Sequence, residues 1–273
     1  MNNRSDLFPP PSWVLAAFAA DGAATLLVGG RGLAWRAGSI VVKPADTSEE
    51  GLSWQAGTLS AIREDGFRLS LPRRSLHGTF VVDGWSASTF CTGSHEPRRW
   101  LDIIRVGERL HAALASCRFP EFVRRRIDPW AIADRAAWGD VPLAPYLEAP
   151  HAARLANLLK PVQAPSQIIH SDLTCNVLFA DGLPPAVIDL SAYWRPAGYA
   201  SAIVVADALA CEGASPSDLG PATSVGGFGQ LLLRALLFRI VTDWLVDSAA
   251  STAGASAYSA AVDLAVHLVR QDR

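Results

Sequence analysis

The sequence predicts an α+β protein with two parts, a β-rich N-terminal third and a mainly helical remainder. In the first third, short apolar runs separated by glycine turns are typical of antiparallel strands, for example TLLVGG, LAWRAG and SIVVKP within residues 25–44. After Gly93, apolar residues recur at helical spacing. The change of pattern lies near residues 91–97, so we expect one unit over residues 1–92 and another over residues 93–273.

The other elements of the first unit follow from local signals. Residues 11–20 predict a short helix with prolines at its start. Proline is tolerated there because an N–H in the first turn has no hydrogen-bond partner within the helix. Residues 47–62 predict a second helix, with Thr47 or Ser48 as its N-cap. The stretches FRLSLPRRSL, GTFVVDGW and ASTFCTG alternate like the remaining strands of an antiparallel sheet.

The second unit is predicted to be helical around a few short strands. WLDIIRVGERLHAALAS, at residues 100–116, has apolar residues at helical spacing. Three β-prone runs follow, at residues 167–170, 177–179 and 186–190. From about residue 199 the chain returns to helical patterns: SAIVVADALA, GQLLLRALLFRIVTDWLV and ASAYSAAVDLAVHLVR.

Composition excludes several classes of function. Half of the 273 residues are apolar. The formal net charge is −2, so the chain has no excess of positive charge that would favour binding to nucleic acid or to an anionic membrane. The most apolar helix candidate, residues 231–246, contains three charged residues and is shorter than the roughly 20 residues of a membrane span. The four cysteines have no metal-binding spacing, and the first residues do not resemble a signal peptide. We therefore expect a cytoplasmic protein with free thiols; the sequence indicates no oligomeric state.

A glycine-rich turn precedes a strand that ends in lysine. The turn, VGGRGLAW, contains Gly29, Gly30 and Gly32, which would let backbone N–H groups approach an anion. Taken alone, such a turn closes hairpins of every kind. Because SIVVK follows it directly, the ammonium of Lys43 would lie close to the same anion, so the combination favours a phosphate site.

The stretch HSDLTCNVL is the most polar part of an apolar neighbourhood. An ordinary turn would also favour Asp, Asn and Ser. Asp172 and Asn176 nevertheless share one short loop between two apolar runs, and Asp189 ends a strand that is predicted to return by a hairpin through DGLPP. A carboxylate that orients a hydroxyl, with an amide and a second carboxylate that bind Mg²⁺, is the set that phosphoryl transfer requires.

These residues carry a family resemblance. His170, Ser171, Asp172 and Asn176, followed by VID at residues 187–189, resemble the catalytic and metal-binding motifs of the aminoglycoside phosphotransferase family. The segment HSDLTCNVLFADGLPPAVIDLSAYWRP is similar to an actinobacterial subgroup of unassigned substrate. The resemblance extends over most of the chain in order, although only residues 167–194 are specific. It implies a two-lobed, protein-kinase-like fold.

The resemblance also implies a role for each matching residue. Asp172 would be the catalytic base, and Asn176 and Asp189 would bind Mg²⁺. The nucleotide, ATP or GTP, would be bound by the glycine turn, the Lys43 ammonium and a hinge at the adenine, which would give the set Gly29, Gly30, Gly32, Lys43, Phe90 and Cys91. In the same family a helix glutamate pairs with the lysine, and Glu50 is our candidate for that position.

Some positions depart from the family pattern. Three residues separate Asp172 from Asn176, where the family has four, and Ser171 replaces a glycine. Leu190 replaces the aromatic residue that follows the metal-binding aspartate. Glu50 lies at the very start of its helix, about one turn before the expected position.

Three other polar residues are predicted to be structural. His170 is expected to fix the backbone near Asp189, and His111 is expected to pack within its helix. Asp207 is expected to be a structural acid that holds the segment after the metal-binding aspartate in place.

The residues thus indicate an ATP- and Mg²⁺-dependent phosphotransferase that phosphorylates a hydroxyl of a small molecule. The alternative is a catalytically impaired, kinase-like protein that binds nucleotide for regulation, with transfer abolished by the shortened loop. Phosphorylation of a protein is less favoured, because no activation-loop or APE-like segment follows Asp189. A faint acidic excess after Tyr193 does not single out polycationic antibiotics from sugars or amino alcohols.

Overall fold

The computed structural model describes residues 8–28 and 32–271 and divides into two compact units. The first contains the chain up to His95 together with Cys175–Leu190, and the second contains Glu96–Thr174 and the chain from Ser191 onward. Residues 175–190 therefore belong to the β-rich unit, although the sequence pattern predicted them in the unit over residues 93–273. Their strands pair with a strand of the first unit.

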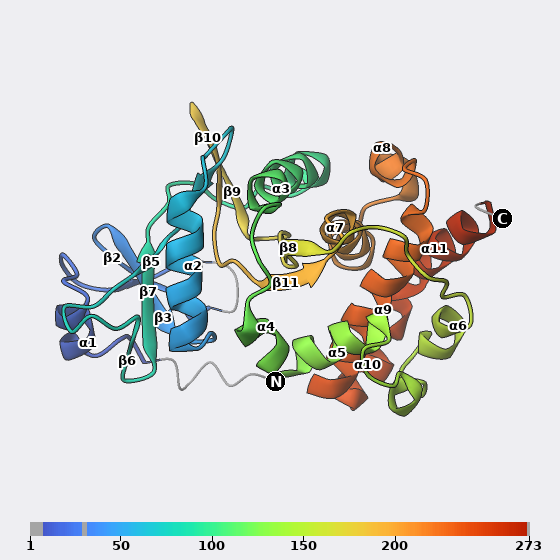
Figure 1. Ribbon diagram of the computed structural model, residues 1–273, viewed down its shortest axis with the longest axis horizontal. Helices are drawn as coiled ribbons and strands as arrows, with labels where there is room; N and C mark the ends of the chain where they lie inside the picture. The colour runs from blue at the N-terminus through green and yellow to red at the C-terminus, as the bar shows by residue number, and fades with distance from the viewer. Residues whose placement is uncertain (1–7, 29–31, 272–273) are drawn as a thin grey trace. The chain divides into compact units, whose positions relative to one another are not determined.

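The first unit is built on an antiparallel sheet (Figure 1), with strand order β1-β2-β3-β7-β5 and with β6 paired to β7. Its strands are β1 (Thr25–Leu26), β2 (Trp35–Ala37), β3 (Ile40–Pro44), β5 (Pro72–Arg73), β6 (Val81–Val82) and β7 (Trp85–Thr89). Alternation along β3 buries Ile40 and Val42, which pack with Val14 and Phe18 from the region of helix α1 (Ser12–Ala17). The predicted strands of residues 25–44 are present.

Helix α2 (Glu49–Ala61) lies alongside this sheet. The Ser48 side chain accepts a hydrogen bond from the Gly51 N–H at 3.1 Å, so one of the two expected N-caps is the cap in the structure. The Glu49 carboxylate accepts hydrogen bonds from the backbone N–H groups of Phe80 and Val81. The start of α2 is thus bound to the start of strand β6.

A second, three-stranded sheet has the order β4-β10-β9. Strands β9 (Val177–Ala180) and β10 (Leu183–Val187) form the predicted hairpin, and β10 pairs in parallel with β4 (Arg68–Leu69). Strand β4 is therefore not part of the antiparallel sheet, although its sequence pattern predicted it there. This long-range pairing is what joins residues 175–190 to the first unit.

The second unit is mainly helical. Its two-stranded sheet pairs β8 (Gln167–His170) with β11 (Ala192–Arg195) in antiparallel register. Its helices are α3 (Trp100–Leu114), α4 (Glu121–Arg125), α5 (Pro129–Trp138), α6 (Ala152–Ala156), α7 (Gly198–Cys211), α8 (Gly220–Thr223), α9 (Phe228–Val246), α10 (Ser248–Ala253) and α11 (Ser259–Gln271).

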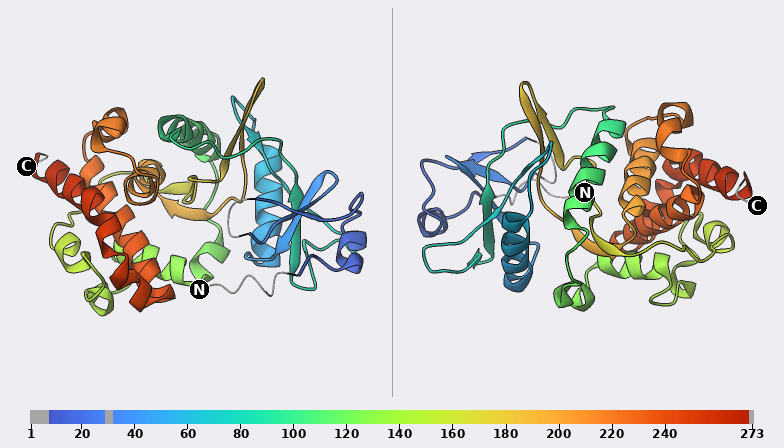
Figure 2. Two further views of the ribbon diagram at one scale, coloured as in Figure 1. Left: turned by 180° about the vertical axis from the view of Figure 1, so that it is seen from behind. Right: turned by 45° about the horizontal axis from the view of Figure 1, so that its top comes forward.

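Helix α9 is the centre of this unit. It packs against α5, α7 and α11, and both views of Figure 2 show α9 and α11 side by side. Apolar residues cover most of its circumference, as expected for a helix that is enclosed by other helices. Two arginines, Arg234 and Arg239, lie among these apolar residues and have their own polar partners. In the described part of the chain, no helix combines the length and the apolarity that a membrane span requires.

Candidate active site

In the first unit, Lys43 joins two carboxylates. Its ammonium lies 2.7 Å from Asp189 Oδ1 and 2.8 Å from Asp46 Oδ2. Burial opposes the charged form of Lys43, but the attraction of Asp189 and then of Asp46 outweighs burial and raises the pKa of the ammonium above its ordinary value. The group therefore stays charged at neutral pH, at the end of a strand whose other residues are largely apolar.

Asn176 and Asp189 lie at the same end of the β9–β10 hairpin. Val177 pairs with Val187 in the ladder, and the next residues continue it, because the Ile188 N–H donates to the Asn176 carbonyl at 3.0 Å. An amide oxygen and a carboxylate at one hairpin end are hard oxygen donors of the kind that Mg²⁺ prefers. The residues present therefore fit the expected ion.

The backbone at this end of the hairpin is unusual. Asp189 has φ of +51° and Cys175 has φ of +60°, both in the left-handed region that residues other than glycine seldom adopt. Only three residues separate Asp172 from Asn176, and the chain turns within this short loop through the left-handed conformation of Cys175. On the other side of Asp189, the buried Gln55 of α2 donates to the Leu190 carbonyl at 3.1 Å and holds the following segment.

In the second unit, Asp172 follows strand β8, and its side chain is 49% exposed. Arg239 Nη2 donates to Asp172 Oδ1 at 2.8 Å, and the same guanidinium binds Asp207 through both Nε and Nη2. Burial disfavours the charged guanidinium, but Asp207 and then Asp172 outweigh it, so the pKa of Arg239 is raised further above its ordinary value. Thr174 Oγ1 also donates to Asp207, at 2.9 Å, so Asp207 ties the loop as a structural acid.

Two histidines hold the backbone that precedes Asp172. His170 Nδ1 accepts a hydrogen bond from the Asp172 N–H at 3.1 Å, and His111 Nε2 accepts one from the His170 N–H at 3.0 Å. Burial, and secondarily the proximity of His170, lowers the pKa of His111 to about 3, so this imidazole is neutral at physiological pH. His170 thus has a structural contact, and the backbone it fixes is that of Asp172.

The remaining expected residues are placed as follows. Gly29 and Gly30 lie outside the described residues, whereas Gly32 has φ of +69° with open space where a Cβ would stand. The Phe90 N–H donates to the Ser39 carbonyl, and the Arg36 guanidinium lies 3.8 Å from the centre of the Phe90 ring. The Cys91 thiol is buried, and burial raises its pKa.

Glu50 lies in the first turn of α2, and its pairing with Lys43 stays a prediction. Two site residues were missed from the sequence, Asp46 and Arg239. Asp46 follows Lys43 by three residues in the segment between β3 and α2. This spacing is a local signal, but acidic residues on protein surfaces often lie near a lysine in the same way. Arg239 is a charge within an apolar helix, and such a charge requires a partner when it is buried.

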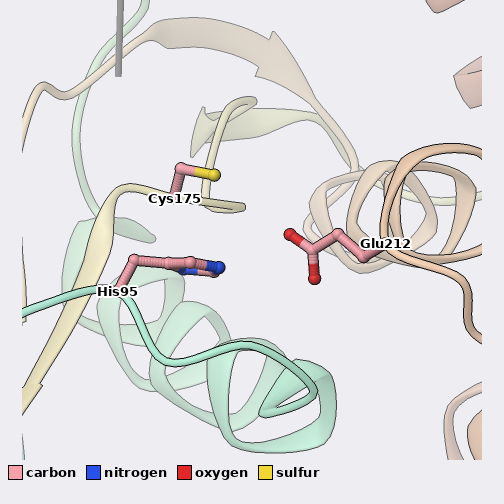
Figure 3. A group of neighbouring side chains, drawn as sticks. All are labelled: His95, Cys175 and Glu212. Carbon is pink, nitrogen blue, oxygen red and sulfur yellow. The ribbon is translucent and has the colours of Figure 1, made fainter. Parts of the chain in front are cut away.

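Figure 3 shows His95 and Cys175 of the first unit side by side, and their ligand atoms lie within 4.8 Å of each other. Glu212, the third side chain drawn there, belongs to the second unit. Two ligands from one unit are fewer than a structural zinc site uses, so this pair assigns no metal centre.

No protein-family model and no curated protein matches this sequence. Solved structures do match. An aminoglycoside phosphotransferase from Alicyclobacillus acidocaldarius subsp. acidocaldarius has a TM-score of 0.59 at 12% identity, with 100% of this chain and 98% of that chain covered. Spectinomycin phosphotransferase APH(9)-Ia, in complex with ADP and spectinomycin, has a TM-score of 0.56 at 14% identity over 94% and 96% of the two chains.

A thermostable mutant of aminoglycoside phosphotransferase APH(4)-Ia, in a ternary complex with ADP and hygromycin B, matches with a TM-score of 0.58 at 11% identity, over 94% of this chain and 97% of that one. The protein has the kinase-like fold of these phosphotransferases. The predicted α+β, protein-kinase-like fold is therefore confirmed. At identities this low, the likeness concerns the fold.

Proposed function

We propose that this protein is an ATP- and Mg²⁺-dependent phosphotransferase that transfers the γ-phosphate to a hydroxyl group of a small molecule. The observation that supports it most is the geometry of Asp172. Its backbone N–H is bound by His170 and its carboxylate by Arg239, yet half of the side chain stays exposed. A carboxylate that is both held and accessible suits a group that orients a reacting hydroxyl.

The first unit would bind the nucleotide. Lys43 is charged and held at the end of β3, where it would contact the phosphates, with the turn that contains Gly29, Gly30 and Gly32 covering them. Phe90 and Cys91 would lie against the base. Several structures of the same fold contain ADP, AMP or AMP-PNP, which supports a nucleotide site of this kind.

Asn176 and Asp189 would hold Mg²⁺, which when bound neutralises negative charge on the nucleotide phosphates. Lys43, through its contact with Asp189, would keep that carboxylate in place. Asp172 would accept a hydrogen bond from the acceptor hydroxyl and align its oxygen with the γ-phosphorus. It would take up the proton as the new P–O bond forms and the bond from the γ-phosphorus to the β–γ bridging oxygen breaks, with ADP as the leaving group.

The acceptor is a hydroxyl compound of low molecular weight. The named relatives in fold bind spectinomycin and hygromycin B, but sugars and amino alcohols offer the same hydroxyl chemistry. One observation favours the second candidate, a nucleotide-binding protein without transferase activity. The loop between Asp172 and Asn176 is one residue shorter than the family motif and requires a left-handed Cys175.

The test uses the purified full-length chain. Hydroxyl compounds are first screened for thermal stabilisation in the presence of Mg²⁺ and a non-hydrolysable ATP analogue, because a ligand that binds the native state raises its melting temperature. Compounds that stabilise are then assayed with ATP for transfer of phosphate. The Asp172→Asn variant is expected to abolish transfer, whereas Asp181→Asn, in the exposed turn of the β9–β10 hairpin, is expected to leave it unchanged.

Tight ATP binding with neither transfer nor slow ATP hydrolysis would support the second candidate. Turnover that persists in Asp172→Asn would refute the role of Asp172. Absence of ATP binding would refute both candidates.

A further inference from the structure

We infer that Arg239 is a positioning residue that sets the orientation of the Asp172 carboxylate by bridging it to Asp207. The catalytic part of this inference rests on the proposed phosphotransferase function. The bridge consists of hydrogen bonds within the second unit only: Nη2 to Asp172 Oδ1 at 2.8 Å, Nη2 to Asp207 Oδ2 at 2.7 Å and Nε to Asp207 Oδ1 at 2.8 Å.

The contact with Asp207 fixes the plane of the guanidinium. Two parallel N–H···O bonds to one carboxylate leave a planar fork little freedom to rotate. Asp207 itself is held, because it projects from the buried face of α7 and accepts the Thr174 hydroxyl. The side chains of Asp207 and Arg239 are only 11% and 16% exposed, so water competes little for these bonds.

The contact with Asp172 then transmits that fixed orientation. Because Nη2 donates to Asp172 Oδ1, one oxygen of this carboxylate is turned toward Arg239 of α9. The Asp172 backbone is held by a separate hydrogen bond, from its N–H to His170 Nδ1. With both its backbone and one carboxylate oxygen held, Asp172 keeps a single side-chain orientation.

The cation also separates two like charges. Asp172 and Asp207 share one guanidinium, so removal of Arg239 would leave two carboxylates that repel each other beside a buried space. A lysine at this position would carry the charge but would lack the planar fork, so it would not hold both carboxylates at once.

The experiment compares Arg239→Lys with Arg234→Lys. Arg234 is a matched control, because it is a buried arginine of the same helix that donates instead to the Gln230 and Lys160 carbonyls. We expect Arg239→Lys to lower kcat for transfer by about 10- to 100-fold, since small misplacements of a reacting group cost rates of that order, with KM for ATP within about twofold of wild type. Arg234→Lys is expected to change kcat by less than about threefold.

Chemical rescue provides a readout that a merely structural role would not give. Millimolar guanidinium chloride is expected to restore part of the kcat of Arg239→Ala, because the free ion can occupy the vacated site between the carboxylates, whereas methylammonium chloride at the same concentration is not expected to do so. An equal response to both salts would refute a requirement for the guanidinium fork.

A crystal structure of Arg239→Lys tests the inference without relying on activity, and it remains decisive if Arg239→Ala does not fold. We expect the Asp172 side chain to leave its wild-type rotamer or to occupy more than one. If the structure shows this change while wild type transfers phosphate to no acceptor, the positioning role stands and the proposed function fails. An Asp172 rotamer identical to that of wild type, or an unchanged kcat in Arg239→Lys, overturns the inference.

Discussion

The ammonium of Lys43 lies 2.7 Å from the carboxylate of Asp189, so the end of strand β3 and the end of the β9–β10 hairpin meet in one ion pair. Asp46 adds a second carboxylate at 2.8 Å from the same ammonium. This arrangement leads to separate expectations for the lysine, for each acid and for the strained backbone around them.

Asp189→Ala is expected to lower the rate of phosphate transfer by about 100-fold or more, because it removes the proposed metal ligand and the charge partner of Lys43. The measurement is the transfer rate at saturating Mg²⁺ and ATP. Asp181→Ala, in the exposed turn of the same hairpin, serves as the control and is expected to retain wild-type activity. Unchanged activity in Asp189→Ala would overturn the assignment of Asp189.

Lys43→Ala, by contrast, is expected mainly to raise KM for ATP.

Asp46→Asn and Glu50→Gln distinguish the acid that supports Lys43. Because Asp46 contacts the ammonium directly, Asp46→Asn is expected to raise KM for ATP several-fold, and Glu50→Gln is expected to have the smaller effect. Steady-state kinetics with ATP as the varied substrate make the comparison. A larger increase in KM for Glu50→Gln would instead support the helix glutamate as the partner of Lys43.

Substitution of Cys175 tests the left-handed turn in the shortened loop. A β-branched side chain is strained at φ of +60°, whereas asparagine tolerates that conformation, so Cys175→Val is expected to be less stable than Cys175→Asn by about 1 kcal/mol. Urea denaturation of both variants gives the difference in the free energy of unfolding. The same pair at Cys211, in helix α7, is the control, because valine and asparagine have similar helix propensities. Equal stability of the two Cys175 variants would argue against a left-handed residue there.

His111 makes stability depend on pH. Its pKa is about 3 in the folded protein and about 6.5 in an unfolded chain, so below pH 6.5 the unfolded state binds the extra proton and gains stability. The contribution of His111 is complete above pH 6.5 and falls as the pH drops toward 3, by about 2 kcal/mol between pH 8 and pH 5. We expect His111→Gln, which retains an acceptor for the His170 N–H, to flatten the dependence of the free energy of unfolding on pH.

His267→Gln is the matched control for that measurement. His267 is exposed on α11, so its replacement shows the effect of losing a histidine that is not buried. A His111→Gln variant whose stability falls with pH as steeply as that of wild type would contradict the depressed pKa.

Patterns within short stretches of sequence predicted much of the fold. Alternation and glycine turns predicted the strands of residues 25–44, Ser48 was one of two expected N-caps of α2, and the DGLPP turn predicted the β9–β10 hairpin. Each of these depends on interactions between residues that are close in the chain. The pairing of β4 with β10 was not predictable in this way, because it joins segments more than one hundred residues apart.

The same division holds for the candidate site. By itself, the sequence determined which residues are candidates for phosphate transfer, because side-chain type and spacing suffice to indicate that chemistry: Asp172, Asn176, Asp189 and Lys43. Only the tertiary structure decided which partners hold them. Arg239 binds Asp172 across 67 residues of chain, and Gln55 binds the Leu190 carbonyl across 135. Such contacts arise when separately formed helices and strands pack and their buried polar groups must find hydrogen-bond partners, which no local pattern specifies.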